Sequence, residues 1–516
     1  MSAPRPQDVP STDPDLVVRL RGDLAAAQYT VEAVEELLGP VATAALHREQ
    51  ALPAGRRTDA SAHPAATLLR TFVLGGEVPR AALERALPGL TVDGAAQLGL
   101  VSAAGADDVD PVRARVDLRP YAATDAAGEI AWWIASDLGE LATGRSLRPD
   151  HVLGVGGASA TLARLTVRNH RARTLDLGTG CGIQALHAAR HSDAVVATDV
   201  SRRALAFAGF NAALADVSLE MREGSMLEPV ATEQFDLVVS NPPFVITPRG
   251  AGLPLFEYRD AGWSGDDVVR SLVQDVGRVL APGGVAQLLG NWEHRGGEDW
   301  RERVGRWVDE SGLEAWIVQR DVQDPAEYAE TWLRDAGTTP ERDPDGWESA
   351  YGAWLDDLAS RDVEAVGFGM VLLRRPADGV PRLRRLEEQH GPVPGALGDH
   401  LGRSLAAVDL LARSDDDALL GLHLVVPADV TEERHLRPGA LDPTLVLLRQ
   451  GAGFGRVRQV GTALGGLVGA CDGELSVGDL ARGIAVLLDL PVDDLVRELV
   501  PQVRELVADG FLEPAT

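Results

Sequence analysis

The regular alternation of strand-like and helix-like segments between residues 146 and 300 constrains the fold of this chain more than any other feature. Short apolar strand candidates, TLDL, AVVATDV, SLEMREG, FDLVVS and GVAQLLGNW, are separated by helical stretches such as IQALHAARH and SRRALAFAGFNAALA. Apolar strands that alternate with helices form a parallel sheet with both faces covered. We therefore predict a doubly wound α/β domain in the middle of the chain.

The segments on either side set the expected domain boundaries. Two further strand candidates, LEAWIVQR and AVGFGMVLLRR, flank an acidic helical insert at about 322–361, so the central domain should span 146–376. Residues 15–145 show helical spacing, then two short helices and a strand pair. This pattern predicts a helical or winged-helix-like module, and a helical cap with a hairpin fits it equally well. Residues 377–516 predict an α+β, winged-helix-like module, and 1–14 a disordered arm.

Composition excludes several classes of protein. The chain has 516 residues, enough for roughly two to four domains. No apolar run reaches the roughly 18 residues that a membrane span requires. The start, MSAPRPQDVPSTDPD, has no apolar signal-like core, so we expect a cytoplasmic protein without membrane contact. The two cysteines, Cys181 and Cys471, provide neither a disulfide framework nor a zinc site, so we expect no metal.

The net charge bears on the partner. It is −28, and the 49 basic residues are all arginine. A net-negative surface repels phosphate backbones at long range, although a local arginine patch can still bind them. The charge therefore favours a protein partner over RNA or DNA.

The segment RTLDLGTGCGIQALHAAR contains the first candidate ligand site. A strand candidate ends at Asp176, and Gly178, Gly180 and Gly182 form the turn into a helix. Glycines permit positive φ and let a ligand approach the backbone, while the helix N-terminus offers free N–H groups. The dinucleotide fingerprint G-x-G-x-x-G is not met, because the third glycine comes one residue early. The turn therefore disfavours NAD.

A carboxylate follows the next strand candidate. Asp199 ends AVVATDV, where it can accept both ribose hydroxyls of a nucleoside. Together with DLGTGCG, this arrangement resembles the class I S-adenosylmethionine-dependent methyltransferases, a Rossmann-like fold, from about residue 150 to 292. The resemblance implies S-adenosyl-L-methionine as cofactor, with Asp176 near its amino group and Ser225 and Met226 of EGSML beside adenine. Many relatives have an acidic residue where this chain has Ser225. The candidate cofactor residues are Asp176, Gly178, Thr179, Gly180, Gly182, Asp199, Val200, Ser225 and Met226.

The strand candidate FDLVVS ends in a second unusual segment, Asn241-Pro242-Pro243-Phe244. An NH₂ group on a planar system is a poor nucleophile because its lone pair is delocalised. The Asn241 side-chain oxygen and the Pro242 carbonyl can each accept one of its N–H groups, while the prolines keep the corner rigid and Phe244 lies against the planar face. We take these four residues as the catalytic candidates, acting by orientation and electrostatics.

This corner resembles the (D/N)-P-P-(Y/F/W) motif of amino methyltransferases that modify glutamine amides, adenine N6 or guanine N2. NPPFVITP is similar to the N-P-P-Y-V-V-T-P segment of release-factor glutamine methyltransferases. Phe244, in place of their tyrosine, is commoner in the small-domain rRNA guanine-N2 methyltransferases. We predict an N-methyltransferase that acts on a glutamine side chain of a translation protein. The alternative acceptor is an rRNA, tRNA or DNA base amino group, guanine N2 or adenine N6.

A third hypothesis is a catalytically silent cofactor-binding scaffold, and the intact corner argues against it.

The sequence leaves the role of two further regions undecided. Residues 151–159, HVLGVGGAS, are either a lid over the site or a plain connection. Tyr258 and Trp263 either line the acceptor channel or pack in the core.

Overall fold

The computed structural model describes residues 9–125, 127–249, 256–260, 262–391, 393 and 395–515. The chain forms two compact units. The first holds residues 1–163, 170–381 and 385–388, and the second holds 164–169, 382–384 and 389–516. Within the described residues, no helix has the length and apolar character needed to cross a bilayer.

An eight-stranded sheet of order β13-β11-β12-β10-β9-β6-β7-β8 forms the centre of the first unit. Its strands are β6 (Arg171–Leu177), β7 (Ser192–Asp199), β8 (Glu220–Glu223), β9 (Phe235–Ser240), β10 (Leu280–Arg295), β11 (Glu314–Gln323), β12 (Val363–Arg374) and β13 (Arg384–Glu388). Strands β8, β7, β6, β9 and β10 run parallel, and β12 inserts antiparallel between β10 and β11. The α/β prediction is confirmed. The strand order reverses at β6, which pairs with both β7 and β9, and ligands bind at such switch points.

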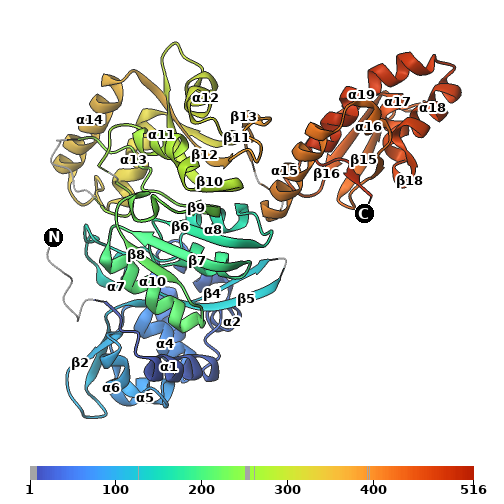
Figure 1. The fold of residues 1–516 in the computed structure, drawn as a ribbon. Coiled ribbons are helices and arrows are strands. Elements are labelled where there is room, and N and C mark those ends of the chain that lie inside the picture. Colours follow the sequence, from blue (N-terminus) through green and yellow to red (C-terminus); the bar gives the residue numbers. More distant parts are fainter. Residues whose placement is uncertain are drawn as a thin grey trace. The chain divides into compact units, whose positions relative to one another are not determined.

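Helices cover both faces of this sheet (Figure 1). One face carries α9 (Ile183–Ala189) and α10 (Arg202–Ala215), and the other carries α11 (Asp267–Asp275) and α12 (Trp300–Ser311). The α11–α12 side buries a core that includes Trp292, Trp300 and Trp307. Because both faces are covered, β9 is apolar along almost its whole length, as parallel strands usually are. Short elements connect these layers: α7 (Glu140–Thr143), α8 (Gly157–Leu165) and the 3₁₀ turns Glu228–Val230 and Val276–Arg278.

The N-terminal part of the first unit is mostly helical. Its helices are α1 (Pro14–Ala26), α2 (Val31–Leu46), α3 (Ala51–Asp59), α4 (Pro64–Phe72), α5 (Arg80–Ala86) and α6 (Thr91–Gln97). Its small sheet, of order β1-β3-β2, comprises β1 (Val78–Pro79), β2 (Val101–Ala103) and β3 (Pro111–Ala114). A helix, a short strand, two helices and two strands thus follow one another in this part of the chain. The strand pair expected from the sequence at about 112–138 instead includes a separate two-stranded sheet, β4 (Asp117–Asp125) and β5 (Gly128–Ser136).

The prediction of a disordered arm is wrong for residues 9–14. Residues 1–8 lie outside the described residues, but the chain packs from residue 9 onward. Pro10 is buried, and the Ser11 N–H donates to the Leu98 carbonyl at 2.9 Å. Asp13 caps α1 by accepting from two backbone N–H groups. A Pro- and Ser-rich composition therefore did not identify a segment that is fixed by contacts remote in sequence.

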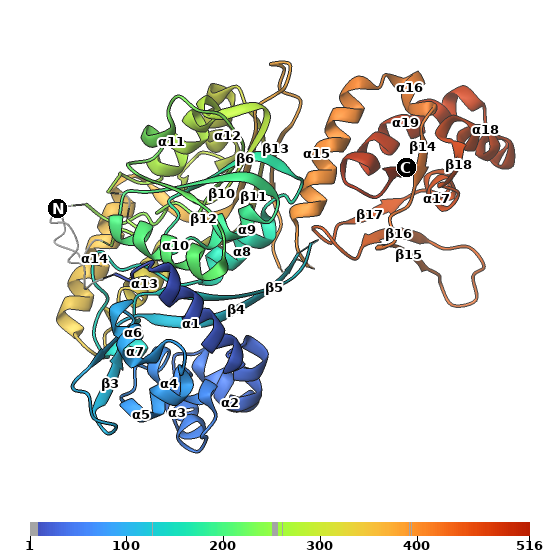
Figure 2. The same cartoon turned by 60° about the horizontal axis from the view of Figure 1, so that its bottom comes forward.

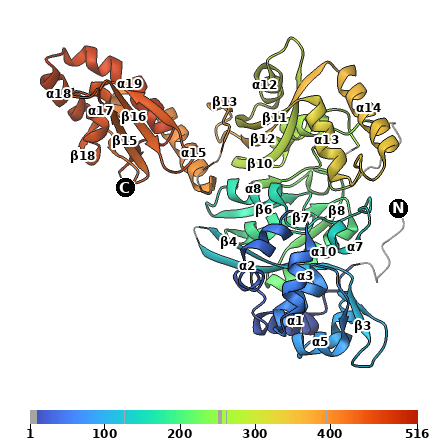
Figure 3. The same cartoon turned by 180° about the vertical axis from the view of Figure 1, so that it is seen from behind.

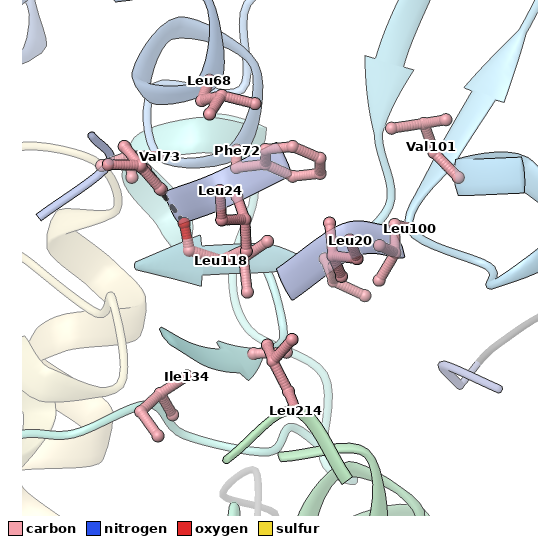
Figure 4. Packing of buried hydrophobic residues seen from close by; sticks show 14 of the residues in the cluster. Leu20, Leu24, Leu68, Phe72, Val73, Leu100, Val101, Leu118, Ile134 and Leu214 are labelled. Atoms are coloured by element: carbon pink, nitrogen blue, oxygen red, sulfur yellow. Dashed lines mark hydrogen bonds between the residues drawn. The ribbon is translucent and has the colours of Figure 1, made fainter. Parts of the chain in front are cut away.

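A long hairpin joins the helical part to the central domain. Its strands, β4 (Asp117–Asp125) and β5 (Gly128–Ser136), lie between the N-terminal helices and α10 (Figures 1 and 2). Figure 4 shows this shared core, where Leu24 and Phe72 of the helices lie near Leu118 of β4, with Leu214 of α10 in the same cluster. The N-terminal part therefore packs directly on the helix that follows β7.

The insert forms two helices, α13 (Pro325–Asp335) and α14 (Pro344–Ser360), which lie beside β11 and β12 (Figure 3). Its position matches the expected range of 322–361. The expected boundary at 376 differs from the structure, because β13 adds an edge strand to the sheet at residues 384–388. The sequence of β13, RRLEE, is charged, so it resembles a linker rather than a strand.

The second unit is α+β. Its helices are α15 (Gly398–Arg413), α16 (Asp416–Leu420), α17 (Thr462–Gly469), α18 (Val477–Leu488) and α19 (Val492–Ala508). Its strands form two sheets: β18 (Asp472–Ser476), β14 (His423–Val425) and β19 (Glu513–Pro514) in one, and β15 (Val430–His435), β16 (Leu445–Gln450) and β17 (Val457–Val460) in the other. It has its own core, with Leu467, Val503 and Phe511 fully buried.

Candidate active site

A cavity opens at the carboxyl ends of β6, β7 and β9, at the switch point of the sheet. Its empty volume is about 900 Å³, part of which is open to solvent. Its lining comes from the turn after β6, the end of β7, the corner after β9 and two segments outside the sheet. The lining residues are His151, Val152, Leu153, Gly154, Ser159, Gly178, Thr179, Gly180, Cys181, Ile183, Gln184, Asp199, Val200, Ser201, Ala204, Asn241, Pro243, Glu257 and Tyr258.

The three glycines of the turn have positive φ angles of 72°, 56° and 88° at Gly178, Gly180 and Gly182. Their surroundings differ. A Cβ at Gly178 or Gly180 would meet no atom within 4 Å, and both residues line the cavity. A Cβ at Gly182 would lie 3.0 Å from the Ala208 side chain in α10. The first two glycines therefore expose backbone to a ligand, while the third allows α9 and α10 to pack closely.

Asp176 lies beneath this turn and is not part of the cavity lining. Its side chain is buried, and one carboxylate oxygen, Oδ2, accepts from the Thr179 hydroxyl at 2.6 Å and the Ala185 N–H at 2.9 Å. The other oxygen, Oδ1, is buried without a hydrogen-bond partner among the described residues. Burial raises the pKa of Asp176 to about 7. The residue thus shapes the turn and keeps one acceptor atom unused.

Asp199 reaches the cavity from the end of β7. Its carboxylate accepts from the Gly180 N–H at 3.0 Å and from the Ser201 N–H at 2.8 Å, which ties β7 to the glycine turn. Burial raises the pKa of Asp199, and the nearby Glu257 carboxylate contributes to this rise. Val200 also lines the cavity.

The cavity is acidic. Asp199 and Glu257 are its two carboxylates, and its lining, all within the described residues, includes no arginine. A site for a pyrophosphate would be expected to contain cations or an uncovered helix N-terminus. This charge pattern suits a ligand that carries a positive charge.

The corner after β9 places its residues in different environments. Asn241 and Pro243 line the cavity, Pro242 is buried, and Phe244 does not line it. The Asn241 Oδ1 atom is buried without a hydrogen-bond partner among the described residues. The Phe244 ring packs on Phe368 of β12, with 5.5 Å between the ring centroids. One residue of the cavity lining, Asn241, therefore carries a buried amide oxygen that no described residue uses.

Ser225 and Met226 do not line the cavity. They follow β8, where Ser225 is exposed and Met226 packs partly against the α11–α12 core. Met226 adopts a positive φ of 49°. Of the predicted site residues, the structure therefore brings together in the cavity lining Gly178, Thr179, Gly180, Asp199, Val200, Asn241 and Pro243. It leaves outside the lining Asp176, Gly182, Ser225, Met226, Pro242 and Phe244.

Sequence reasoning missed Glu257 and Gln184 and left Tyr258 and residues 151–159 undecided. The Gln184 side chain donates to the Ser159 carbonyl at 2.7 Å, which holds α8 against α9. The Glu257 N–H donates to the Pro149 carbonyl at 2.9 Å. Segment 151–159 therefore forms part of the cavity wall, while Trp263 lies elsewhere and is 45% exposed. No motif marks Glu257, so composition and spacing alone had no signal for it.

Two further observations bear on thiol and metal chemistry at the site. Burial raises the pKa of Cys181 to about 11, so its thiol stays protonated at neutral pH. Among the described residues, no cluster of three or more His, Cys, Asp or Glu side chains is arranged to hold a metal ion.

Comparison with known proteins identifies the class. Residues 154–253 match the methyltransferase small domain, and residues 26–115 match a domain of unknown function (DUF7059). With the strand order and the glycine turn, this match shows that the central part of the chain is a class I S-adenosylmethionine-dependent methyltransferase domain.

Relatives of this domain include two kinds of glutamine methyltransferase. The release factor glutamine methyltransferase of Deinococcus radiodurans is 40% identical over 129 residues, covering 23% of this chain and 46% of that protein. The ribosomal protein uL3 glutamine methyltransferase of Bradyrhizobium diazoefficiens is 33% identical over 165 residues, covering 29% and 51%. The chain thus spans about half the length of these relatives. Among solved structures, a 16S rRNA N2 G1207 methyltransferase of T. thermophilus is 20% identical with a TM-score of 0.26, covering 52% of this chain and 68% of that one.

Proposed function

We propose that this protein is an S-adenosylmethionine-dependent N-methyltransferase that acts on the side-chain amide of a protein glutamine. One observation carries the proposal: the buried Asn241 Oδ1 atom has no hydrogen-bond partner among the described residues, and Asn241 lines the cavity at the switch point of the sheet. A buried acceptor without a donor costs free energy of roughly 1–3 kcal/mol. An N–H donor from a substrate would remove this cost.

The residues present fit S-adenosyl-L-methionine. The bare backbone at Gly178 and Gly180 leaves room for a ligand at the turn, and Thr179 lies between them. Asp199 is placed to accept from ribose hydroxyls, beside Val200. The sulfonium and ammonium groups of the cofactor suit a cavity with two carboxylates and no arginine. Asp176 would act indirectly by shaping the turn, and Ser225 and Met226 would need to move to reach adenine.

The corner would have to orient the acceptor amide and would not have to activate it chemically. The cofactor supplies an electrophilic methyl group whose bond to sulfur breaks as its bond to the acceptor nitrogen forms. Asn241 Oδ1 and the Pro242 carbonyl would accept the two amide N–H groups and so direct the nitrogen toward the methyl group. The nitrogen then loses one proton to solvent. This step requires no strong base in contact with the amide.

Two observations support a glutamine acceptor. Relatives of the domain are named as glutamine methyltransferases that act on release factors and on ribosomal protein uL3. The charge of −28 opposes the approach of a polyanion. We therefore propose a protein of the translation machinery as partner. A base amino group of RNA or DNA is the alternative, supported by Phe244 and by the element order of the N-terminal part.

The experiment is to incubate the purified protein with methyl-tritiated S-adenosylmethionine and a lysate of its own organism. Each reaction is divided between protease and nuclease. We expect the macromolecular label to be lost on protease treatment and kept through nuclease treatment, followed by recovery of N5-methylglutamine on hydrolysis. Label that is lost to nuclease would contradict a protein acceptor, and the absence of any label would contradict transfer itself.

A further inference from the structure

We propose that Tyr328, on helix α13 of the insert, is the residue that positions the Asn-Pro-Pro-Phe corner for catalysis. The inference rests on the proposed methyl transfer. It assigns a role in that reaction to an insert that none of the matched family models covers.

The Tyr328 hydroxyl is hydrogen-bonded to the chain just after the corner. The Tyr328 hydroxyl oxygen accepts the Ile246 backbone N–H at 3.0 Å and the Asn291 side-chain N–H at 2.8 Å. All three groups are buried, with Tyr328 only 2% exposed. Ile246 follows Phe244 by two residues, so this bond fixes the backbone directly after the corner. The hydroxyl thus joins α13, β10 and the corner at one atom.

The sheet register explains why Asn291 lies beside the corner. Ser240, the last residue of β9, pairs with Leu288 of β10 in parallel register. Asn291 is three residues further along β10, and Pro243 is three residues further along the chain after β9. Asn291 therefore lies past the last β9–β10 pair but still within β10, where it pairs with Phe368 of β12. Beyond that last pair, the Tyr328 hydroxyl connects Asn291 to Ile246 of the segment that follows the corner.

The same helix also holds residues 256–260, a segment that supplies Glu257 and Tyr258 to the cavity lining. The Arg259 guanidinium donates to the Trp332 carbonyl at 2.8 Å and to the Asp335 carboxylate at 3.2 Å. The Tyr258 hydroxyl donates to Asp335 at 3.3 Å, and Tyr258 lines the cavity. The Arg259 carbonyl in turn accepts the Val245 N–H at 3.1 Å. Helix α13 therefore holds both the chain directly after the corner and the neighbouring segment 256–260.

Packing gives the helix the rigidity that this role requires. Val245 and Ile246, which directly follow the corner, share a buried cluster with Tyr328, Leu333 of α13 and Trp354 of α14. Burial also raises the pKa of Tyr328 well above the neutral range, so the hydroxyl is un-ionised and its bonds do not change with pH. Because a small displacement of a reacting group is enough to slow a reaction strongly, a fixed corner matters for rate.

The test uses the full-length protein with Tyr328→Phe, which removes one oxygen atom and keeps the ring. Tyr351→Phe is the matched control, because Tyr351 lies on α14 of the same insert and its exposed hydroxyl donates to the Ala326 carbonyl, away from the corner. Two readouts are taken: the maximum rate and the cofactor KM of tritium transfer to the lysate protein fraction, and hydrogen exchange of the amides in residues 241–249.

For Tyr328→Phe we expect a maximum rate that falls about 10- to 100-fold, with an unchanged cofactor KM. The Ile246 amide should exchange faster, and Tyr351→Phe should behave as the parent protein does. Equal exchange and equal rates in the two variants would overturn the proposal, as would a parallel loss of rate and cofactor affinity. If the parent protein transfers no methyl group, the proposed function fails, and hydrogen exchange alone then decides whether Tyr328 fixes the corner.

Discussion

Asp199 is the last residue of β7 and Asn241 directly follows β9, and both line the same cavity, yet their hydrogen bonding differs. The Asp199 carboxylate is already engaged by the Gly180 and Ser201 backbone N–H groups. The Asn241 Oδ1 atom accepts nothing from the described residues. We therefore expect the two side chains to contribute to different steps, Asp199 to the shape of the cofactor site and Asn241 to the reaction.

For Asn241→Ala we expect cofactor affinity to persist while methyl transfer falls by roughly 100-fold or more, because the lost group is an acceptor needed only when the amide is bound. Titration calorimetry with S-adenosylmethionine and the tritium assay measure the two quantities. Asp199→Ala serves as the reciprocal control, with weaker cofactor binding expected. Normal transfer by Asn241→Ala would refute the proposed corner.

The raised pKa of Asp176 predicts a specific pH dependence of stability. Its ordinary value is 3.8, and burial raises it to about 7 in the folded protein. Between these values the folded state binds a proton that the unfolded state does not, so this residue's contribution to stability falls as pH rises. From pH 5.5 to 8, Asp176→Asn should gain about 2 kcal/mol relative to the parent protein. Denaturant unfolding measures this difference, and a difference independent of pH would contradict the shift.

Some of these residues could be predicted from sequence and others could not. Gly178, Gly180, Asp199 and Asn241 follow strands whose apolar runs are unmistakable, so their place at one sheet edge follows from topology. Glu257 comes from a segment without periodicity, and its contact with the site depends on contacts remote in sequence. Asp176 was placed at the correct strand end, but its burial depends on how tightly the turn folds over it.

At the scale of elements, Asn211 of α10 links three parts of the first unit. Its Oδ1 accepts the Ala135 N–H at 2.8 Å, and its Nδ2 donates to the carbonyls of Ala135 and Cys181 at 2.9 and 2.8 Å. It is fully buried. Strand β5 of the hairpin, helix α10 and the glycine turn are therefore joined through one amide.

We expect Asn211→Leu to lower the free energy of unfolding by about 3 kcal/mol or more, because it leaves three buried backbone groups unpaired. Cofactor affinity should fall as well, since Cys181 belongs to the turn that lines the cavity. Gln502→Leu is the comparison variant, because its amide donates to the Glu498 carbonyl within α19. A loss of stability no larger than that of Gln502→Leu would show that the amide is dispensable.

Elements with strong periodicity were the predictable ones. Strands β6, β7, β9, β10, β11 and β12 correspond to largely apolar runs in the sequence, whereas β8, with the sequence EMRE, does not. Helices α13 and α14 fall within residues 322–361. Strand β13 was not predicted, because an edge strand needs few apolar residues. The contact between α13 and the segment after the corner could not be predicted either. The sequence around Tyr328 does not indicate that its hydroxyl accepts the backbone N–H of Ile246.

At the scale of the whole molecule, the two compact units have separate cores, and every residue that lines the cavity belongs to the first unit. We expect calorimetry to resolve two unfolding transitions. Saturating S-adenosylmethionine, at about 100 times its Kd, should stabilise only the transition of the first unit, by about 2.7 kcal/mol. Leu467→Ala, in the core of the second unit, identifies the other transition. A single transition shifted as a whole would contradict independent units.

The acidic lining of the cavity also bears on turnover. Asp199 and Glu257 attract a cation more strongly than a neutral molecule of the same shape. A sulfonium ion that gives up its methyl group becomes a neutral thioether, so we expect the two carboxylates to hold the demethylated product less tightly than the fresh cofactor. Product inhibition should accordingly be weak at low ionic strength and should increase when Glu257 is neutralised. We therefore expect the cavity to distinguish spent from fresh cofactor by charge.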